Sequence, residues 1–348
     1  MRPLADLTQT ELGAWLAAAE EPDYRTSQIF DWVFQRRVRS VDEMTDLPVA
    51  LRRLLAAEFA VRSGGELTRS VAADGTAKLL IGWPDGATTE CVMIPGGGAR
   101  RTACLSTQVG CDVGCTFCAS GIGGSQRDLS VGEVLEQALA VGDLLAAAGE
   151  RLSHVVFMGM GEPLINYDVT VAAVRRLNDA HGLGIAQRRI TISTVGLPKQ
   201  IERLAGEGLQ TTVAVSLHAP NDVLRRQLIP WARSIPLARL LKACGRYFER
   251  THREVTFEYC LLADVNDRPE HAGQLAGIAR NSRANVNLLM YNPVPTLPYA
   301  RPSRNTAIDF LNRLRAAGVN AHLRESRGLE ADAACGQLRR RAAASVDR

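Results

Sequence analysis

The feature that most constrains the fold is a regular alternation of short apolar segments with longer amphipathic ones, from about residue 101 onward. The short segments have strand composition and lie at residues 102–106, 154–158, 189–193, 211–216, 255–259, 286–289 and 321–324. Apolar residues at helical spacing mark residues 131–148, 167–179, 198–206, 237–249 and 307–317. This order of strands and helices predicts an α/β protein with a parallel β/α barrel or open partial barrel, whose chemistry lies at the carboxyl ends of the strands.

Two smaller units precede this part of the chain. The first is predicted to be helical, and Thr8 and Glu11 form a capping box at its first helix. The second is predicted to be a β-hairpin, because two apolar runs flank the turn at residues 84–86. The predicted domains are a helical accessory domain at 1–62, a hairpin and linker at 63–100, a core at 101–338, and a charged, frayed tail at 339–348.

The composition limits the class of protein. Among the 348 residues, no apolar run approaches the roughly 20 residues that a membrane span needs. The first residues also lack a signal-peptide core, so we expect a cytoplasmic protein with no membrane partner. In that compartment the eight cysteines are thiols, metal ligands or redox catalysts rather than structural disulfides. The net charge of +4 is compatible with a nucleic-acid partner but does not demonstrate one.

Three cysteines, Cys111, Cys115 and Cys118, lie within eight residues in a glycine-rich segment that follows a predicted strand. A structural zinc site needs four ligands, usually as two pairs, and the fourth is missing locally. Three thiolates at this spacing suit three corners of a [4Fe–4S] cluster and leave one iron open to an outside ligand. The sequence therefore predicts an iron–sulfur cluster at which a reaction takes place.

Other polar residues follow predicted strands. Glycine lets a ligand approach the backbone at Gly161, and Glu162 can accept hydrogen bonds from a cationic amino group. Small hydroxyls and an imidazole at strand ends suit ribose and carboxylate oxygens, and an amide suits an adenine edge. These residues are Ser193, Ser216, His218 and Asn292. Taken alone, Glu162 fits an ordinary helix-starting turn equally well, and His218 fits a packing histidine.

Several motifs, in order along the chain, resemble the RlmN/Cfr family of radical S-adenosylmethionine (SAM) adenosine methyltransferases. They are CLSTQVGC at 104–111, FMGMGEP at 157–163, SLHAP at 216–220, YNP at 291–293 and DAACGQL at 332–338. The likeness extends over about residues 21–340. It implies a radical-SAM partial β/α barrel with a small N-terminal helical domain and a connecting hairpin. It also implies a [4Fe–4S] cluster on Cys111, Cys115 and Cys118, and two SAM molecules per turnover.

The same resemblance implies roles for individual residues. The implied SAM contacts are Gly161, Glu162, Ser193, Ser216, Leu217, His218 and Asn292. Cys104 and Cys335 match the family's paired catalytic cysteines, and Glu90 resembles its proton acceptor. In the implied mechanism Cys335 becomes S-methylcysteine, its methyl group is converted to a radical that adds to the base, and Cys104 resolves the adduct. A solvent-facing strand glutamate is the alternative for Glu90.

The remaining cysteines, Cys91, Cys244 and Cys260, lie in strand or helix patterns and are predicted to be buried structural thiols.

The implied substrates are C2 of an adenosine in 23S rRNA and of a tRNA adenosine beside the anticodon. The implied partners also include a low-potential electron donor such as flavodoxin or ferredoxin, and we expect a monomer. The arginines of the N-terminal helices are predicted to contact RNA. The C8-directed branch of the family, associated with antibiotic resistance, shares these motifs, but residues 162–163 and 293–298 favour C2.

Two hypotheses from different classes of protein also account for part of the pattern. A non-catalytic iron–sulfur or zinc module that binds nucleic acid would not need Cys335. A glycyl-radical-type activase would leave the pair of Cys104 and Cys335 unexplained.

Overall fold

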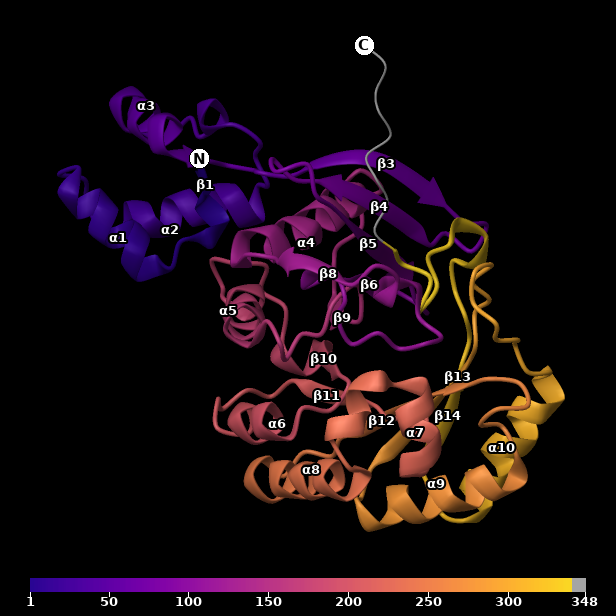
Figure 1. The fold of residues 1–348 in the computed structure, drawn as a ribbon. Helices are drawn as coiled ribbons and strands as arrows, with labels where there is room; N and C mark the ends of the chain where they lie inside the picture. Colours follow the sequence, from indigo (N-terminus) through magenta and orange to yellow (C-terminus); the bar gives the residue numbers. More distant parts are fainter. Residues whose placement is uncertain (340–348) are drawn as a thin grey trace.

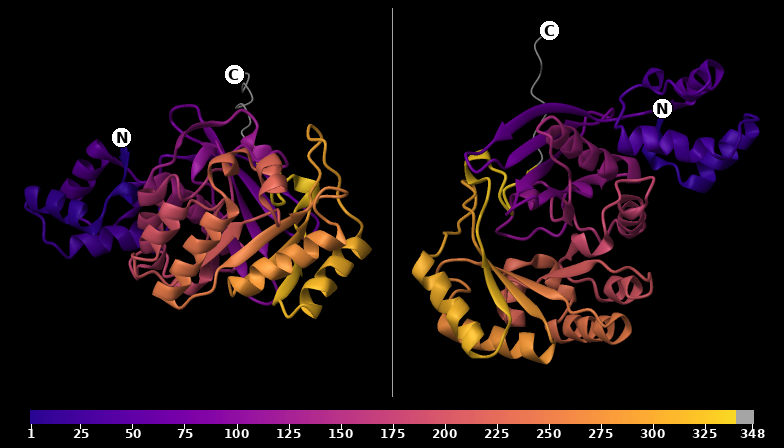
Figure 2. Two further views of the ribbon diagram at one scale, coloured as in Figure 1. Left: turned by 60° about the horizontal axis from the view of Figure 1, so that its bottom comes forward. Right: turned by 180° about the vertical axis from the view of Figure 1, so that it is seen from behind.

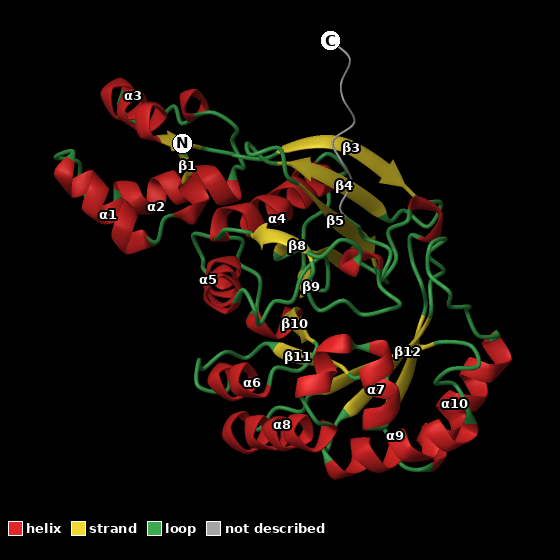
Figure 3. Ribbon diagram, viewed as in Figure 1, coloured by secondary structure: helices red, strands yellow, loops and turns green. Residues whose placement is uncertain are grey.

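The computed structural model describes residues 1–339, and its main element is a curved ten-stranded sheet (Figures 1 and 3). Seven strands pair in parallel along the chain. They are β6 (Arg101–Cys104), β9 (His154–Phe157), β10 (Ile190–Thr194), β11 (Thr212–Ser216), β12 (Thr256–Leu261), β13 (Asn285–Met290) and β14 (Ala321–Arg324). Each corresponds to a predicted strand, so the predicted partial β/α barrel is confirmed.

Helices lie around the outside of this sheet (Figure 1). They are α4 (Val131–Ala146), α5 (Tyr167–Asn178), α6 (Pro198–Leu204), α7 (Asp222–Leu228), α8 (Leu237–Thr251), α9 (Pro269–Asn281) and α10 (Arg304–Ala316). Helices α7 and α9 were not predicted from the sequence. Helix α7 is only seven residues long, and in α9 the glycines Gly273 and Gly277 interrupt the apolar pattern.

The hairpin is larger than predicted and joins the barrel sheet. It consists of β3 (Gly65–Val71), β4 (Ala77–Gly82) and β5 (Thr88–Pro95), all antiparallel, and β5 pairs with β6. Strand β3 was missed because all seven of its residues are exposed, so it carries no apolar alternation.

The N-terminal unit lies to one side of the barrel, as the right-hand view of Figure 2 shows. It contains α1 (Gln9–Ala18), α2 (Arg25–Phe30) and α3 (Val49–Glu58). The predicted capping box is confirmed, because Glu11 N–H donates to Thr8 Oγ1 at 3.1 Å and Thr8 N–H donates to Glu11 Oε2 at 2.8 Å. The domain boundaries at residues 62 and 100 stay a prediction.

Among residues 1–339, no helix has the length and apolar character needed to cross a bilayer. The predicted frayed tail lies, apart from Arg339, outside the described residues.

The edge strands of the barrel sheet are β14 and β3, and residues 325–339, here called the closing segment, run between them (Figure 1). The segment is tied to the hairpin at several points. Gly328 N–H donates to Asp74 Oδ2 at 2.9 Å, and Ala73 N–H donates to Glu330 Oε2 at 3.2 Å. The open side of the barrel is therefore closed by loop contacts rather than by strand pairing.

A buried ion pair strengthens this closure. Lys78 Nζ lies 3.1 Å from Glu90 Oε1, and the two side chains are only 6% and 1% exposed. Lys78 also donates to the carbonyl of Asp332 at 3.0 Å, and Glu90 Oε2 accepts from Arg339 N–H at 2.9 Å. The pair thus holds the closing segment on both sides of Cys335.

We expect Lys78→Met to lower the free energy of unfolding, measured by urea titration, by about 3–5 kcal/mol, because it leaves a buried carboxylate without its ammonium partner. In the double variant Lys78→Met/Glu90→Gln the charge itself is gone, so part of the loss should be recovered. If the double variant is less stable than Lys78→Met, the stabilising role of the ion pair is refuted.

Candidate active site

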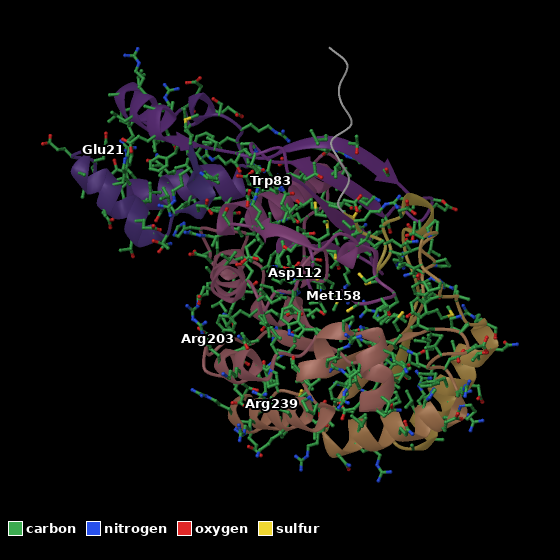
Figure 4. All side chains as sticks on the ribbon, in the orientation of Figure 1. Glu21, Trp83, Asp112, Met158, Arg203 and Arg239 are labelled. Atoms are coloured by element: carbon green, nitrogen blue, oxygen red, sulfur yellow. The ribbon has the colours of Figure 1, made fainter. Side chains whose placement is uncertain are left out.

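A cavity of about 170 Å³ lies at the carboxyl ends of the parallel strands. We call it the upper cavity. Its lining includes Met158, which Figure 4 labels near the middle of the molecule. The structure brings most predicted site residues to this lining: Cys111, Cys115, Cys118, Gly161, Glu162, Ser193, Ser216, His218, Asn292 and Cys335. Leu217 is fully buried in the core beside the cavity and does not line it.

The cysteine loop connects two short strands, β7 (Gln108–Gly110) and β8 (Ser125–Asp128). Gly110 has a φ of +89°, and a Cβ there would lie 2.1 Å from the Gly124 carbonyl oxygen, so only glycine fits. Asp112 Oδ1 accepts a hydrogen bond of 2.6 Å from Ser125 N–H. These contacts fix the base of the loop that presents the three thiols to the cavity.

Burial keeps the three thiols neutral when no metal is bound. It raises the pKa of Cys111 to about 12 and also raises the pKa values of Cys115 and Cys118. Iron would displace these protons and stabilise the thiolates. Within residues 1–339 no three His, Cys, Asp or Glu side chains converge on a single metal ion. In a [4Fe–4S] cluster each cysteine binds a different iron atom. The three cysteines therefore need to face the same cavity, but they do not need to converge on a single metal position.

Gly161 and Glu162 form the turn after β9. At Gly161 φ is +97°, and a Cβ would lie 2.7 Å from the Gln108 side chain. Glu162 is 3% exposed, and its carboxylate accepts from Leu164 N–H at 2.9 Å and from Val195 N–H at 2.6 Å. Burial raises the pKa of Glu162 to about 7, although these two hydrogen bonds lower it. A cationic ligand group beside Glu162 would therefore stabilise its ionised form.

The environment of His218 fixes its tautomer. Its Nδ1 accepts a hydrogen bond of 3.0 Å from Cys260 N–H, so the ring proton lies on Nε2. Burial, with the nearby charge of Arg225 adding to it, lowers the pKa of His218 to about 3. The ring packs edge-on against Phe117 at 5.0 Å between centroids. His218 is thus a neutral hydrogen-bond donor in the cavity wall.

The closing segment lies directly on the cysteine loop. Ala119 N–H donates to the Gly336 carbonyl at 2.8 Å, and Ser120 Oγ donates to the Leu338 carbonyl at 2.6 Å. Asn292 Nδ2 donates to the Cys335 carbonyl at 3.1 Å. The Asn292 amide, predicted to contact SAM, therefore positions the backbone of Cys335, and its contact with SAM stays a prediction.

A second cavity of about 520 Å³, here called the lower cavity, extends toward the amino-terminal ends of the strands. Cys104 and Cys335 both line it, and Cys335 lines the upper cavity as well. The exposed side chain of Cys335 therefore faces internal space. Burial, with Glu258 adding to it, raises the pKa of Cys335 to about 11. Burial, with Cys335 adding to it, also raises the pKa of Cys104.

Glu90 lines neither cavity, and its burial shows that it is not a solvent-facing strand residue. Cys91 and Cys244 are buried as predicted, whereas Cys260 lines the upper cavity. Lys78 and Glu258 were not predicted from the sequence. Each is a charged residue inside an otherwise apolar strand, and this pattern in the sequence indicates a buried charge that needs a partner.

Comparisons with known proteins match both parts of the chain. Residues 105–276 match the Radical SAM superfamily, and residues 3–61 match the Ribosomal RNA large subunit methyltransferase N-terminal domain. A probable dual-specificity RNA methyltransferase RlmN from Thermosynechococcus vestitus is 49% identical over 329 residues, which cover 94% of this chain and 96% of the relative. This chain belongs to the RlmN family of radical SAM RNA methyltransferases.

Further relatives of the RlmN family agree. The probable RlmN of Rhodopirellula baltica is 48% identical, over 95% of this chain and 88% of the relative. The crystal structure of a radical SAM methyltransferase from Sphaerobacter thermophilus aligns with a TM-score of 0.94 and 44% identity, covering 97% of this chain and 99% of that one. Membership of this family implies a [4Fe–4S] cluster and SAM, and three thiols that face one cavity fit such a cluster.

We expect SAM to bind more weakly as the pH falls below about 7. Free Glu162 is protonated below its pKa of about 7, and the amino group of SAM would have to displace that proton. One linked proton weakens binding by up to about tenfold per pH unit. Equilibrium dialysis on the anaerobically reconstituted enzyme measures this. Glu162→Gln should bind SAM more weakly with little dependence on pH, and an unchanged slope in that variant would assign the proton to another group.

Proposed function

We propose that this protein methylates C2 of a specific adenosine in 23S rRNA and of the tRNA adenosine next to the anticodon. The observation that carries the proposal is the position of Cys335, which faces the cluster cysteines on one side and Cys104 on the other. The RlmN relatives are named as dual-specificity RNA methyltransferases, which supports two classes of RNA substrate.

The chemistry of the target explains why cysteines are needed. Carbon 2 of adenine is an electron-poor sp² centre with no lone pair, so it cannot attack the methyl group of SAM directly. Cys335 takes that methyl group by nucleophilic displacement and becomes S-methylcysteine. When bound, the cluster and a second SAM would supply the radical that removes one hydrogen atom from this methyl group, and they would take back one electron from the adduct with the base.

Cys335 then delivers the carbon to the base. Its methylene carbon bonds to C2, so the RNA is joined covalently to the protein. After the ring proton leaves, the Cys104 thiol gives up its proton as its sulfur attacks the Cys335 sulfur, and the sulfur–methylene bond breaks. The released electron pair takes up a proton to form the methyl group. A cellular reductant must reopen the remaining Cys104–Cys335 disulfide before the next turnover. The proposed source of the electron for the cluster is a low-potential donor such as flavodoxin or ferredoxin.

Glu90 is the proposed acceptor of the ring proton. It lies on β5, beside the strand that ends in Cys104. One of its carboxyl oxygens lies 3.1 Å from the Lys78 ammonium nitrogen. Because Glu90 lines neither cavity, this role requires the closing segment to shift.

Replacing either catalytic cysteine should stop the reaction at a different step. Cys335→Ala should abolish RNA methylation while the absorbance and electron paramagnetic resonance of the cluster stay unchanged. Cys104→Ala should accumulate a covalent protein–RNA adduct, visible as a shifted band on a denaturing gel. Cys244→Ala, a buried thiol on α8, is the matched control and should methylate RNA normally. Normal product release by Cys104→Ala would refute the two-cysteine mechanism.

Mass spectrometry of RNA fragments from the wild-type reaction locates the methyl group. We expect it on C2 of adenosine. A methyl group on C8 would assign the protein to the C8-directed branch instead.

A further inference from the structure

We propose that the lower cavity receives the target adenine and that Glu258 recognises the edge formed by its N1 and 6-amino groups. The inference rests on the proposed RNA methylation and specifies the part of the protein that selects the base.

The two cavities meet at a shared wall. Met158, Glu258, Leu289, Asn292 and Cys335 line both of them. The three cluster cysteines line only the upper cavity, and Cys104 lines only the lower one. A methyl group can therefore be loaded onto Cys335 from the upper cavity and transferred to a base in the lower cavity, which Cys104 also lines. The lining residues thus place SAM on the side of the upper cavity and leave the lower cavity for the base.

The lower cavity has the size and lining for a nucleobase. Its volume of about 520 Å³ lies within the range of roughly 300–1,000 Å³ typical of small-ligand sites. Small residues line it, namely Thr102, Thr191, Thr212 and Thr256 near the beginnings of their strands and Ala214 in the middle of β11. They leave room for a flat ring and supply hydroxyl groups.

Glu258 stands in the wall between the cavities, on the inner face of β12. It is 7% exposed. Within residues 1–339, the only hydrogen bond to its carboxyl group comes from Asn287 Nδ2, on the neighbouring strand, at 2.9 Å. A buried carboxyl group with so few partners needs a ligand or a proton. Burial raises the pKa of Glu258, against the effects of Asn287 and Arg324, so the protonated form becomes more accessible.

A protonated carboxyl group can form two hydrogen bonds with neighbouring polar groups of adenine. Its O–H donates to N1, and its carbonyl oxygen accepts from the 6-amino group. Carbon 2 is bonded directly to N1, whereas C8 lies at the opposite end of the purine. Because Glu258 and Cys335 share the same wall, holding N1 at Glu258 brings C2 toward Cys335. This arrangement gives a physical reason for reaction at C2 rather than at C8.

Basic residues lead from the surface to this cavity. Arg100, Arg324 and Arg327 line the lower cavity. Arg100 also lines a neighbouring surface pocket of about 720 Å³, together with Arg151 and Arg189. RNA phosphates bind such side chains, and the base must leave its stack to reach a barrel interior. We infer that the nucleotide enters from the amino-terminal ends of the strands, away from the cluster.

The test combines an altered protein with an altered base. RNA that carries purine riboside in place of the target adenosine lacks the 6-amino group but keeps C2. In the wild type this change should lower kcat/KM by about 10- to 100-fold, as loss of a paired base contact does. Glu258→Ala should lower kcat/KM for adenosine RNA by a similar factor and should barely distinguish the two RNAs. Glu258→Gln should retain most activity, because its amide offers the same donor and acceptor.

Two results would overturn the role of Glu258. The first is that purine riboside lowers kcat/KM by the same factor in the wild type and in Glu258→Ala, because the base change and the protein change would then act independently. The other is loss of SAM cleavage or of Cys335 methylation in Glu258→Ala, which would indicate a structural role. Failure of the wild-type enzyme to methylate adenosine RNA would refute the proposed function itself, and wild-type activity is therefore measured first.

The entry route has its own control. Arg100→Ala should raise KM for RNA and reduce the slope of log KM against log salt by about one, without changing SAM cleavage. Arg239→Ala removes an exposed arginine of α8, labelled in Figure 4, that does not line the lower cavity, and it should leave both quantities unchanged. Equal effects of the two substitutions would contradict entry at Arg100.

Discussion

Closure of the open side of the barrel is the constraint on which the rest of the site depends. The edge strands β14 and β3 are linked by the closing segment, which the buried ion pair of Lys78 and Glu90 fastens to the hairpin. The contact adds two anchors, at residues 332 and 339, on either side of Cys335, which lines both cavities. The hairpin thus contributes to the site by holding the closing segment, although it lines the upper cavity with no residue.

The sequence predicted those features of the fold and the site that depend on residues close together in the chain. Parallel strands covered by helices are continuous apolar runs, and the spacing of Cys111, Cys115 and Cys118 is itself a ligand pattern. The sequence did not predict contacts between residues that lie far apart in the chain. Nothing near Lys78 indicates that it meets Glu90 and the carbonyl of residue 332, and the pairing of Cys104 with Cys335 came only from the family resemblance.

Burial sets the protonation state of nearly every functional group in the site. It holds His218 neutral, raises the pKa of Glu162 to about 7 and keeps the cysteine thiols protonated. A site in this state carries little charge of its own. It therefore responds strongly to the charges that its ligands bring, namely the iron atoms and the cationic groups of SAM.

The closing segment also has a consequence for the order of events during synthesis. Cys335 follows the last strand, whereas the cysteine loop precedes most of the barrel. The ribosome therefore makes every described strand and the three cysteines of the cysteine loop before it makes Cys335, the thiol that accepts the methyl group in the proposed mechanism. A folding intermediate with a formed barrel could hold the cluster but could not yet transfer carbon to RNA. In the proposed mechanism, methyl transfer becomes available only when the closing segment has docked.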